Sequence, residues 1–273
     1  MNRILTIAHL TFIEAVRRRI VPAALLCSVL FLLVFGTALH FIYAHLSGSM
    51  PRQFQLQFFT LAGLYVANFL TIAASVLLPV DTLSGEIDSG VMQTIAAKPI
   101  HRAEIVLGKW LTFWLMAAAY LAITAGGVVL AVYVTTGFAQ QHLGSALPLM
   151  LLGATVMLTI SIAGSARLKT VTNGIVVFAF YGIAFIGGWI EQIGTFTRNE
   201  SARYIGTALS LVSPSDALWR RAAYELQPPV MRGLQISPFG AGSLPSDAMI
   251  WWALGFVALA LAYAVRVLRR RSL

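Results

Sequence analysis

Charged side chains are scarce in this sequence. Asp, Glu, Lys and Arg make up 11 % of its 273 residues, whereas 58 % are hydrophobic and the mean hydropathy is +0.80. Soluble domains carry about 25 % charged residues, so a single soluble core would leave much of this apolar area in water. The composition predicts an integral membrane protein whose side chains lie mainly in lipid.

The excess of basic residues does not indicate a nucleic-acid partner, although the net charge is +9. A nucleic-acid surface needs basic patches on a soluble face. Here the Lys and Arg residues lie mainly in short runs beside apolar stretches. We therefore expect membrane lipid, and no nucleic acid, as a partner.

Motifs for catalysis and for nucleotide binding are also missing. The single cysteine, Cys27, excludes an intramolecular disulfide and a C-x-x-C site. No H-E-x-x-H or G-x-S-x-G occurs, and the five histidines lack metal-ligand spacing. Gly108-Lys109 precedes Trp110, where a phosphate-binding loop has Ser or Thr. We predict no catalytic, metal or cofactor site, so any ATPase must be another chain.

Acidic residues are lacking from the middle of the apolar stretches. Asp81 and Glu191 both lie near the ends of such stretches, where charge costs little. No pair of carboxylates buried within the membrane is expected. A proton-coupled carrier usually has ionisable residues at that depth, so this absence weakens that class.

Six stretches are long enough to cross a membrane, which takes about 20 apolar residues. A helix is the expected form because a lone strand would leave backbone groups unpaired in lipid. The sequence predicts an all-α, polytopic membrane protein with one transmembrane domain over residues 1–273. Its six spans are residues 22–44, 58–80, 106–133, 147–165, 174–193 and 248–265.

The distribution of Lys and Arg predicts the orientation. Thirteen lie in the N-terminal segment, in residues 81–109, in the 166–172 link and in the basic tail 266–273. Six lie in the other connections, five of them within residues 194–247. We therefore predict a protein of the inner (cytoplasmic) membrane, with both termini and residues 81–109 in the cytoplasm.

Residues 1–20 have an amphipathic pattern. Leu5, Ala8 and Phe12 share a helical face with Ala15 and Val16, and basic residues lie opposite. The pattern predicts a helix lying in the cytoplasmic interface. The alternative is a frayed basic tail.

The external region, residues 194–247, is predicted to hold two short helices that lie on the outer surface or dip into it. Ser213-Pro214-Ser215-Asp216 is a helix-start signature. A solvent-exposed linker is the alternative. The two apolar stripes consist of Tyr204, Ile205, Ala208, Leu209 and Val212, and of Leu218, Trp219, Ala222 and Leu226.

Residues 81–109 hold seven of the 29 charged residues and lie between the second and third spans. A helix over residues 84–98 would place Glu86 and Gly90 one turn apart on a small polar face. Gln93 and Ala97 extend this face, and Pro99 ends the helix. We interpret this segment as a cytoplasmic docking helix. An interface helix that touches only lipid headgroups is the alternative.

The same residues resemble the cytoplasmic signature of ABC-2 type transporter permeases. That signature has a Glu and a Gly one turn apart, then P-[IV]-x-R, an acidic-aliphatic pair and G-K. Here it reads Glu86-x-x-x-Gly90 and Pro99-Ile100-x-Arg102-x-Glu104-Ile105-x-x-Gly108-Lys109. The resemblance in sequence is confined to residues 86–109, and the resemblance in architecture covers the chain.

The resemblance implies a permease subunit that forms an export path with a second permease copy, identical or different. Two separate ABC ATPase subunits would use ATP and Mg. In this chain Glu86, Gly90 and Gln93 would contact the ATPase, and Pro99 and Arg102 would fix the bend. Gly108 and Lys109 would start the third span. A secondary carrier or channel without an ATPase, and a membrane anchor or assembly factor, remain alternatives. The spans contain no feature that names a cargo.

Overall fold

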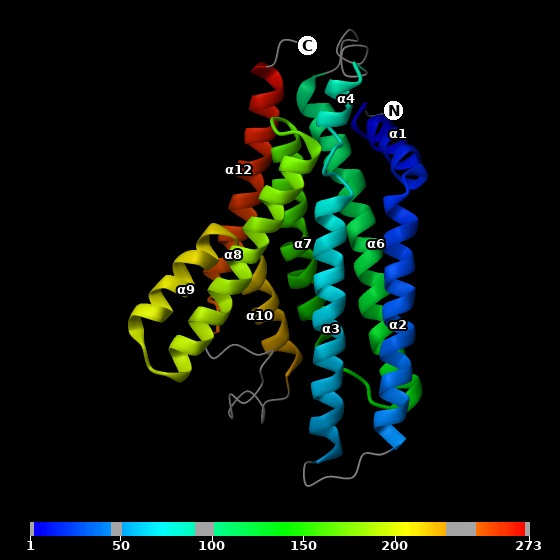
Figure 1. Cartoon of the computed structure of the whole chain (residues 1–273), viewed down its shortest axis with the longest axis vertical. Coiled ribbons are helices and arrows are strands. Elements are labelled where there is room, and N and C mark those ends of the chain that lie inside the picture. Colours follow the sequence, from blue (N-terminus) through cyan, green and yellow to red (C-terminus); the bar gives the residue numbers. More distant parts are fainter. Residues whose placement is uncertain (1–2, 45–50, 91–100, 228–243, 271–273) are drawn as a thin grey trace.

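The fold is helical throughout the part of the chain that the structure describes. The structure is a computed structural model, and it describes residues 3–44, 51–90, 101–227 and 244–270 (Figure 1). All regular elements in these ranges are α-helices.

Six of these helices are long and apolar enough to cross a membrane, as the sequence predicts. They run side by side in an elongated bundle (Figure 1). The end that carries α1, α4 and the last turn of α12 is called the upper end here, and the start of α3 marks the lower end. The six are α2 (Ile20–Ala44), α3 (Arg52–Leu77), α6 (Arg102–Thr136), α7 (Leu143–Ser165), α8 (Thr170–Phe196) and α12 (Ala248–Arg270).

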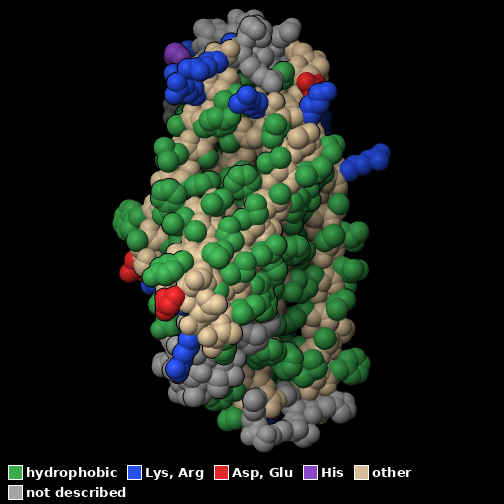
Figure 2. All heavy atoms as spheres, turned by 60° about the vertical axis from the view of Figure 1, so that its left-hand side comes forward, with side chains coloured by type: hydrophobic (Ala, Val, Ile, Leu, Met, Phe, Trp, Pro, Cys, Tyr) green, Lys and Arg blue, Asp and Glu red, His purple; other side chains and the backbone are tan. Residues whose placement is uncertain are grey.

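Large apolar side chains cover the face of the bundle seen in Figure 2, and basic side chains gather near its upper end. On α2, Leu26, Leu30 and Leu33 are each more than 60 % exposed. An apolar surface of this extent marks contact with lipid or protein rather than water. The fold is therefore that of a membrane protein.

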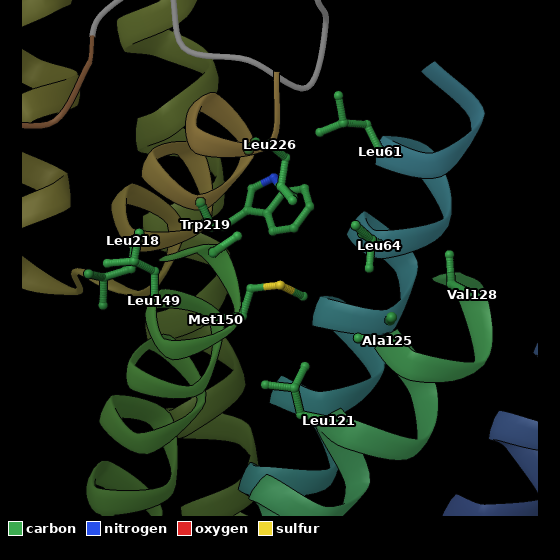
Figure 3. Packing of buried hydrophobic residues seen from close by; sticks show 14 of the residues in the cluster. Leu61, Leu64, Leu121, Ala125, Val128, Leu149, Met150, Leu218, Trp219 and Leu226 are labelled. Atoms are coloured by element: carbon green, nitrogen blue, oxygen red, sulfur yellow. The ribbon is translucent and has the colours of Figure 1, made fainter. Parts of the chain in front are cut away.

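The core lies around α7, which contacts α3, α6, α8, α10 and α12. Figure 3 shows Met150 of α7 beneath the indole ring of Trp219 of α10, with Leu64 of α3 nearby. Lipid chains are as apolar as leucine, so close van der Waals packing must hold such helices together. Small residues allow it: a Cβ at Gly127 would lie 2.5 Å from Leu32.

The N-terminal helix α1 (Arg3–Arg17) packs along the upper part of α6. Thr11 and Ala15 are buried, and Thr112 of α6 donates a hydrogen bond to the Ala8 carbonyl at 2.8 Å. Leu5, Phe12 and Val16, which the sequence grouped on one face, remain exposed. This apolar exposed face suits a helix at a lipid interface.

Two shorter helices follow α8 and return into the bundle. These helices are α9 (Glu200–Val212) and α10 (Ser215–Leu226). α9 runs back along α8, where a Cβ at Gly206 would lie 2.6 Å from the Glu191 backbone nitrogen. At the turn, Ser213 Oγ is 3.8 Å from Met157 Sδ. Met157 precedes the end of α7 at Ser165 by eight residues, or about 12 Å of helix.

The two short helices predicted in residues 194–247 therefore exist, and α10 lies within the bundle. Most of α10 is buried, including the predicted stripe of Leu218, Trp219, Ala222 and Leu226. The predicted stripe of α9 faces outward instead, since Tyr204 is 72 % exposed and Gly206 is buried. In lipid the apolar face needs no protein cover, and the small face gives the closer packing.

Candidate functional site

The turn between α3 and α4 (Ser84–Asp88) anchors α4 in the upper end of the bundle. Leu83 is completely buried in a cluster with Val106 of α6 and Leu158 of α7. Within the turn, the Thr82 N–H donates to the Pro79 carbonyl at 3.0 Å. The start of α4 is thus fixed by core packing.

An ion pair fastens α4 to α6. Lys109 Nζ lies 2.5 Å from Glu86 Oε1, and the two side chains are only 3 % and 11 % exposed. Lys109 also donates to Thr82 Oγ1 at 3.4 Å. A desolvated pair of this kind is costly to break, because the charge left behind is buried and uncompensated. The structure thus joins two predicted site residues that lie 23 positions apart.

A second ion pair connects the same turn to the junction of α1 and α2. The Arg18 guanidinium pairs with Asp81, and it also pairs with Glu14 at 2.6 Å. Burial lowers the pKa of Arg18, but the hydrogen bonds and charges of Glu14 and Asp81 outweigh it, so the net pKa is raised. Arg18 therefore stays charged while it connects the two segments.

A third set of contacts reaches α7 and α8. Ser84 Oγ is 3.4 Å from Thr170 Oγ1 at the start of α8. The buried side chain of Asn173 donates to the carbonyls of Val80 at 2.8 Å and Ser161 at 2.9 Å. One amide of α8 thus connects the α3–α4 turn to α7.

The first turn of α6 is fixed by its own cap and by α12. The His101 N–H donates to Glu104 Oε2 at 2.9 Å, which closes a capping box. Arg102 donates to the Leu268 carbonyl of α12 at 2.5 Å. At Gly108 a Cβ would lie 2.8 Å from Ile7 Cγ2, so glycine is needed where α1 crosses α6.

The helix predicted over residues 84–98 is not continuous in the structure. α4 ends at Asp88, and Gly90 has φ +76°, a left-handed conformation that favours glycine and ends helices. Glu86 and Gly90 therefore do not share one continuous helical face. Gln93, Ala97 and Pro99 lie outside the described residues. On α4 and its cap, Asp88 and Ser89 are the exposed side chains.

A buried charge cluster in α8, α9 and α10 escaped the sequence analysis. Arg220 pairs with Glu191 at 2.9 Å and with Asp216 at 3.0 Å, and it donates to Ser210 Oγ at 3.0 Å. The three charged side chains are at most 11 % exposed. Glu191 lies near the end of α8, as expected, but its buried partners on α10 were not identified from the sequence. The spacing of Asp216 and Arg220, four residues apart, was the available signal.

Comparison with protein families matches residues 5–273 to the family described as ABC-2 family transporter protein. The chain belongs to the ABC-2 family of transporter proteins. No curated protein matches the sequence significantly. The family match confirms the resemblance that the motif in residues 86–109 indicated.

The protein is thus an ABC transporter permease, a multi-pass membrane component of a transport system. In the described part of the permease, no group of three His, Cys, Asp or Glu residues could hold a metal ion. The described contacts at the upper end brace helices against one another. The arrangement of this site suits the transmission of movement.

Proposed function

We propose that this ABC-2 permease is the membrane subunit of an exporter and that its upper end receives the movement of a separate ABC ATPase. Two permease copies, identical or different, would form the path. Two ATPase subunits would bind ATP and Mg. The observation that carries this proposal is the attachment of the α4 region to α1, α6 and α8.

Force on α4 would reach several spans at once. The Glu86–Lys109 pair connects α4 to α6, and the Ser84–Thr170 contact connects it to α8. The Asp81–Arg18 pair connects the preceding turn to α1 and α2. Both side chains of the Glu86–Lys109 pair are largely desolvated, so this link resists separation better than a surface pair.

The structure suggests separate roles for the residues of the predicted ATPase interface. Glu86 faces Lys109 inside the protein, so we assign both a bracing role. Asp88 and Ser89 are exposed and would touch the ATPase. Gly90 would let the chain turn away from α4, and Gln93 would extend the contact. Pro99 and Arg102 would fix the bend into α6, and Gly108 would seat α1.

The charge distribution supports a cytoplasmic upper end. Arg17 ends α1, Arg18 and Arg19 lie between α1 and α2, and Arg269 and Arg270 end α12. Basic residues near membrane helices are retained on the cytoplasmic side. Figure 2 shows basic side chains around this end, in line with an ATPase docking there from the cytoplasm.

Capture of the ATPase by tagged permease tests the proposal. The permease is purified from its own membranes in mild detergent, and co-purified ABC ATPase is measured by mass spectrometry and by ATP hydrolysis. Ser89→Trp places a bulky ring on the proposed contact, while Ser201→Trp makes the same change on an exposed residue of α9. We expect Ser89→Trp to reduce capture about tenfold and Ser201→Trp to leave it unchanged.

Each other result counts against a defined part of the proposal. Absence of any ABC ATPase from the wild-type preparation would favour a carrier or channel. Equal capture by both variants would mean that the ATPase docks on a surface other than α4. Equal thermal unfolding midpoints of the two variants establish that a loss of capture reflects docking rather than unfolding.

A further inference from the structure

A cavity of about 250 Å³ opens at the lower end of the bundle, far from α4. Three segments that are distant in sequence form its wall: the first turns of α3, the link 138–142 between α6 and α7, and the end of α10. Five of its described lining residues are glutamines, and no Asp, Glu, Lys or Arg is among the described lining residues. The five are Gln53, Gln57, Gln140, Gln141 and Gln227.

Two of these glutamines are held in place by the same backbone carbonyl. Gln57 Nε2 donates to the Leu226 carbonyl at 2.6 Å, and Gln140 Nε2 donates to it at 2.9 Å. Gln57 is only 2 % exposed. Since α10 ends at Leu226, this carbonyl has no helical partner of its own. The two side chains therefore satisfy the helix end and are themselves fixed.

The link that carries Gln140 has a defined backbone shape. Gly137 and His142, on either side of residues 138–141, both have left-handed conformations, with φ of 71° and 61°. Phe138 donates its N–H to Thr136 Oγ1 at 3.1 Å. The link is thus a formed wall of the cavity and presents Gln140 toward Leu226.

The Gln140 side chain carries a polar atom that has no partner among the described residues. Gln140 Oε1 is buried and accepts no hydrogen bond from the described residues. A buried acceptor without a donor is unfavourable, and native structures usually provide one. The atom is therefore open to a donor from outside the described residues.

The lining defines the chemistry of such a ligand. Primary amides donate and accept hydrogen bonds without charge, so they match hydroxyl groups in both roles. Phe54 and Phe138 add apolar surface for C–H groups. Among the described lining residues, an anion would find no Lys or Arg, and a metal ion would find no carboxylate. Ligand pockets for drug-sized molecules measure about 300–1,000 Å³, so this cavity suits one ring rather than a chain.

We propose that this cavity binds a single uncharged, hydroxyl-rich group, of the size of one sugar ring. Gln140 Oε1 would accept a hydrogen bond from a ligand hydroxyl. Gln53 and Gln141 would form hydrogen bonds with other hydroxyls of the ligand. The group has two possible sources, a soluble glycoside outside the cell or the headgroup of a neutral glycolipid. The site goes beyond the proposed transport function, because binding here needs neither the ATPase nor turnover.

Saturation-transfer NMR tests the site on the full chain in phosphatidylcholine nanodiscs. Methyl β-glucoside is the probe, and glucuronate is its charged counterpart. Gln140→Leu removes the unpaired acceptor and retains the side-chain volume. Gln55→Leu, on the same turn of α3 as Gln53 but outside the lining, is the matched control. Nanodiscs that contain monogalactosyl diacylglycerol form a second arm, in which a bound headgroup would displace the soluble glycoside.

We expect saturation transfer to methyl β-glucoside and little to glucuronate. Gln140→Leu should weaken binding about tenfold, the effect of losing one buried hydrogen bond, while Gln55→Leu should bind normally. If the glycolipid nanodiscs displace methyl β-glucoside, the lipid headgroup is the source of the bound group. If they do not, the source is the soluble glycoside. The proposal is overturned if neither glycoside nor glycolipid binds, if both glutamine variants behave alike, or if glucuronate binds equally well. Failed binding with normal ATPase capture would leave the transport proposal intact.

Discussion

At the residue scale, Lys109 has a different role from the one its position in the sequence suggests. The G-K pair predicts a residue that starts a span at the membrane surface. In the structure Lys109 is 3 % exposed and pairs with Glu86. A lysine so far from water persists only with a partner charge. That partner could not be identified from the sequence, because the pairing depends on how α4 folds back beside α6.

Removing one partner of this pair should destabilise the permease more than removing both. Lys109→Met leaves the Glu86 carboxylate buried without compensation, which costs about 3–5 kcal/mol. Glu86→Gln combined with Lys109→Met removes both charges, so we expect at least half of that loss to be recovered. Denaturation with SDS, followed by circular dichroism, gives the apparent free energy of unfolding for each variant.

The exposed pair of Arg203 and Glu200, at 3.1 Å, provides the matched control. Exposed ion pairs contribute about 0–1 kcal/mol, so Arg203→Met should change the free energy of unfolding by less than about 1 kcal/mol. If Lys109→Met costs no more than Arg203→Met, the buried pair does not brace α4.

At the scale of elements, α8 and α9 pack through glycine. A Cβ at Gly206 would lie 2.5 Å from the Glu191 Cβ and 2.6 Å from its backbone nitrogen. Backbone atoms cannot move aside as a flexible side chain can. Since Glu191 also pairs with Arg220 of α10, this contact aligns three helices.

Gly206→Ala should therefore push α9 away from α8 and disturb the charge cluster. Overpacking of this kind costs about 1–3 kcal/mol. Gly182→Ala on α8 is the matched control, because a Cβ there meets nothing within 4 Å. We expect a lower thermal unfolding midpoint for Gly206→Ala alone. Equal midpoints would show that α9 can shift without loss of stability. The close contact of Gly206 with Glu191 would then not be needed.

The elements also show what the sequence could predict. All six spans follow from apolar length, because hydrocarbon thickness imposes that length on each helix alone. The ends of α10 follow from Pro214 and Pro228, which are local signals. The return of α9 and α10 into the bundle could not be predicted. It depends on contacts such as Ser213 with Met157, between residues 56 positions apart.

At the scale of the whole molecule, the orientation in the membrane can be tested with single cysteines. Cys27 is the one cysteine of the chain, so Cys27→Ala gives a cysteine-free background. Ser201→Cys at the lower end should react with an impermeant thiol reagent in intact cells. Ser89→Cys at the upper end should react only after lysis. Labelling of cells before and after disruption measures both, and the reverse pattern would invert the topology.

The length of α6 has a consequence for how the two ends of the permease communicate. Its 35 residues form an unbroken rod of about 52 Å, well beyond the ~30 Å of hydrocarbon. Lys109 lies near its upper end, and the link 138–142 follows its lower end. If α6 pivots at mid-membrane like a lever, a tilt of about 5° displaces each end by roughly 2 Å in opposite directions. A pull on Glu86 would then change the shape of the glutamine cavity through the stiffness of a single helix.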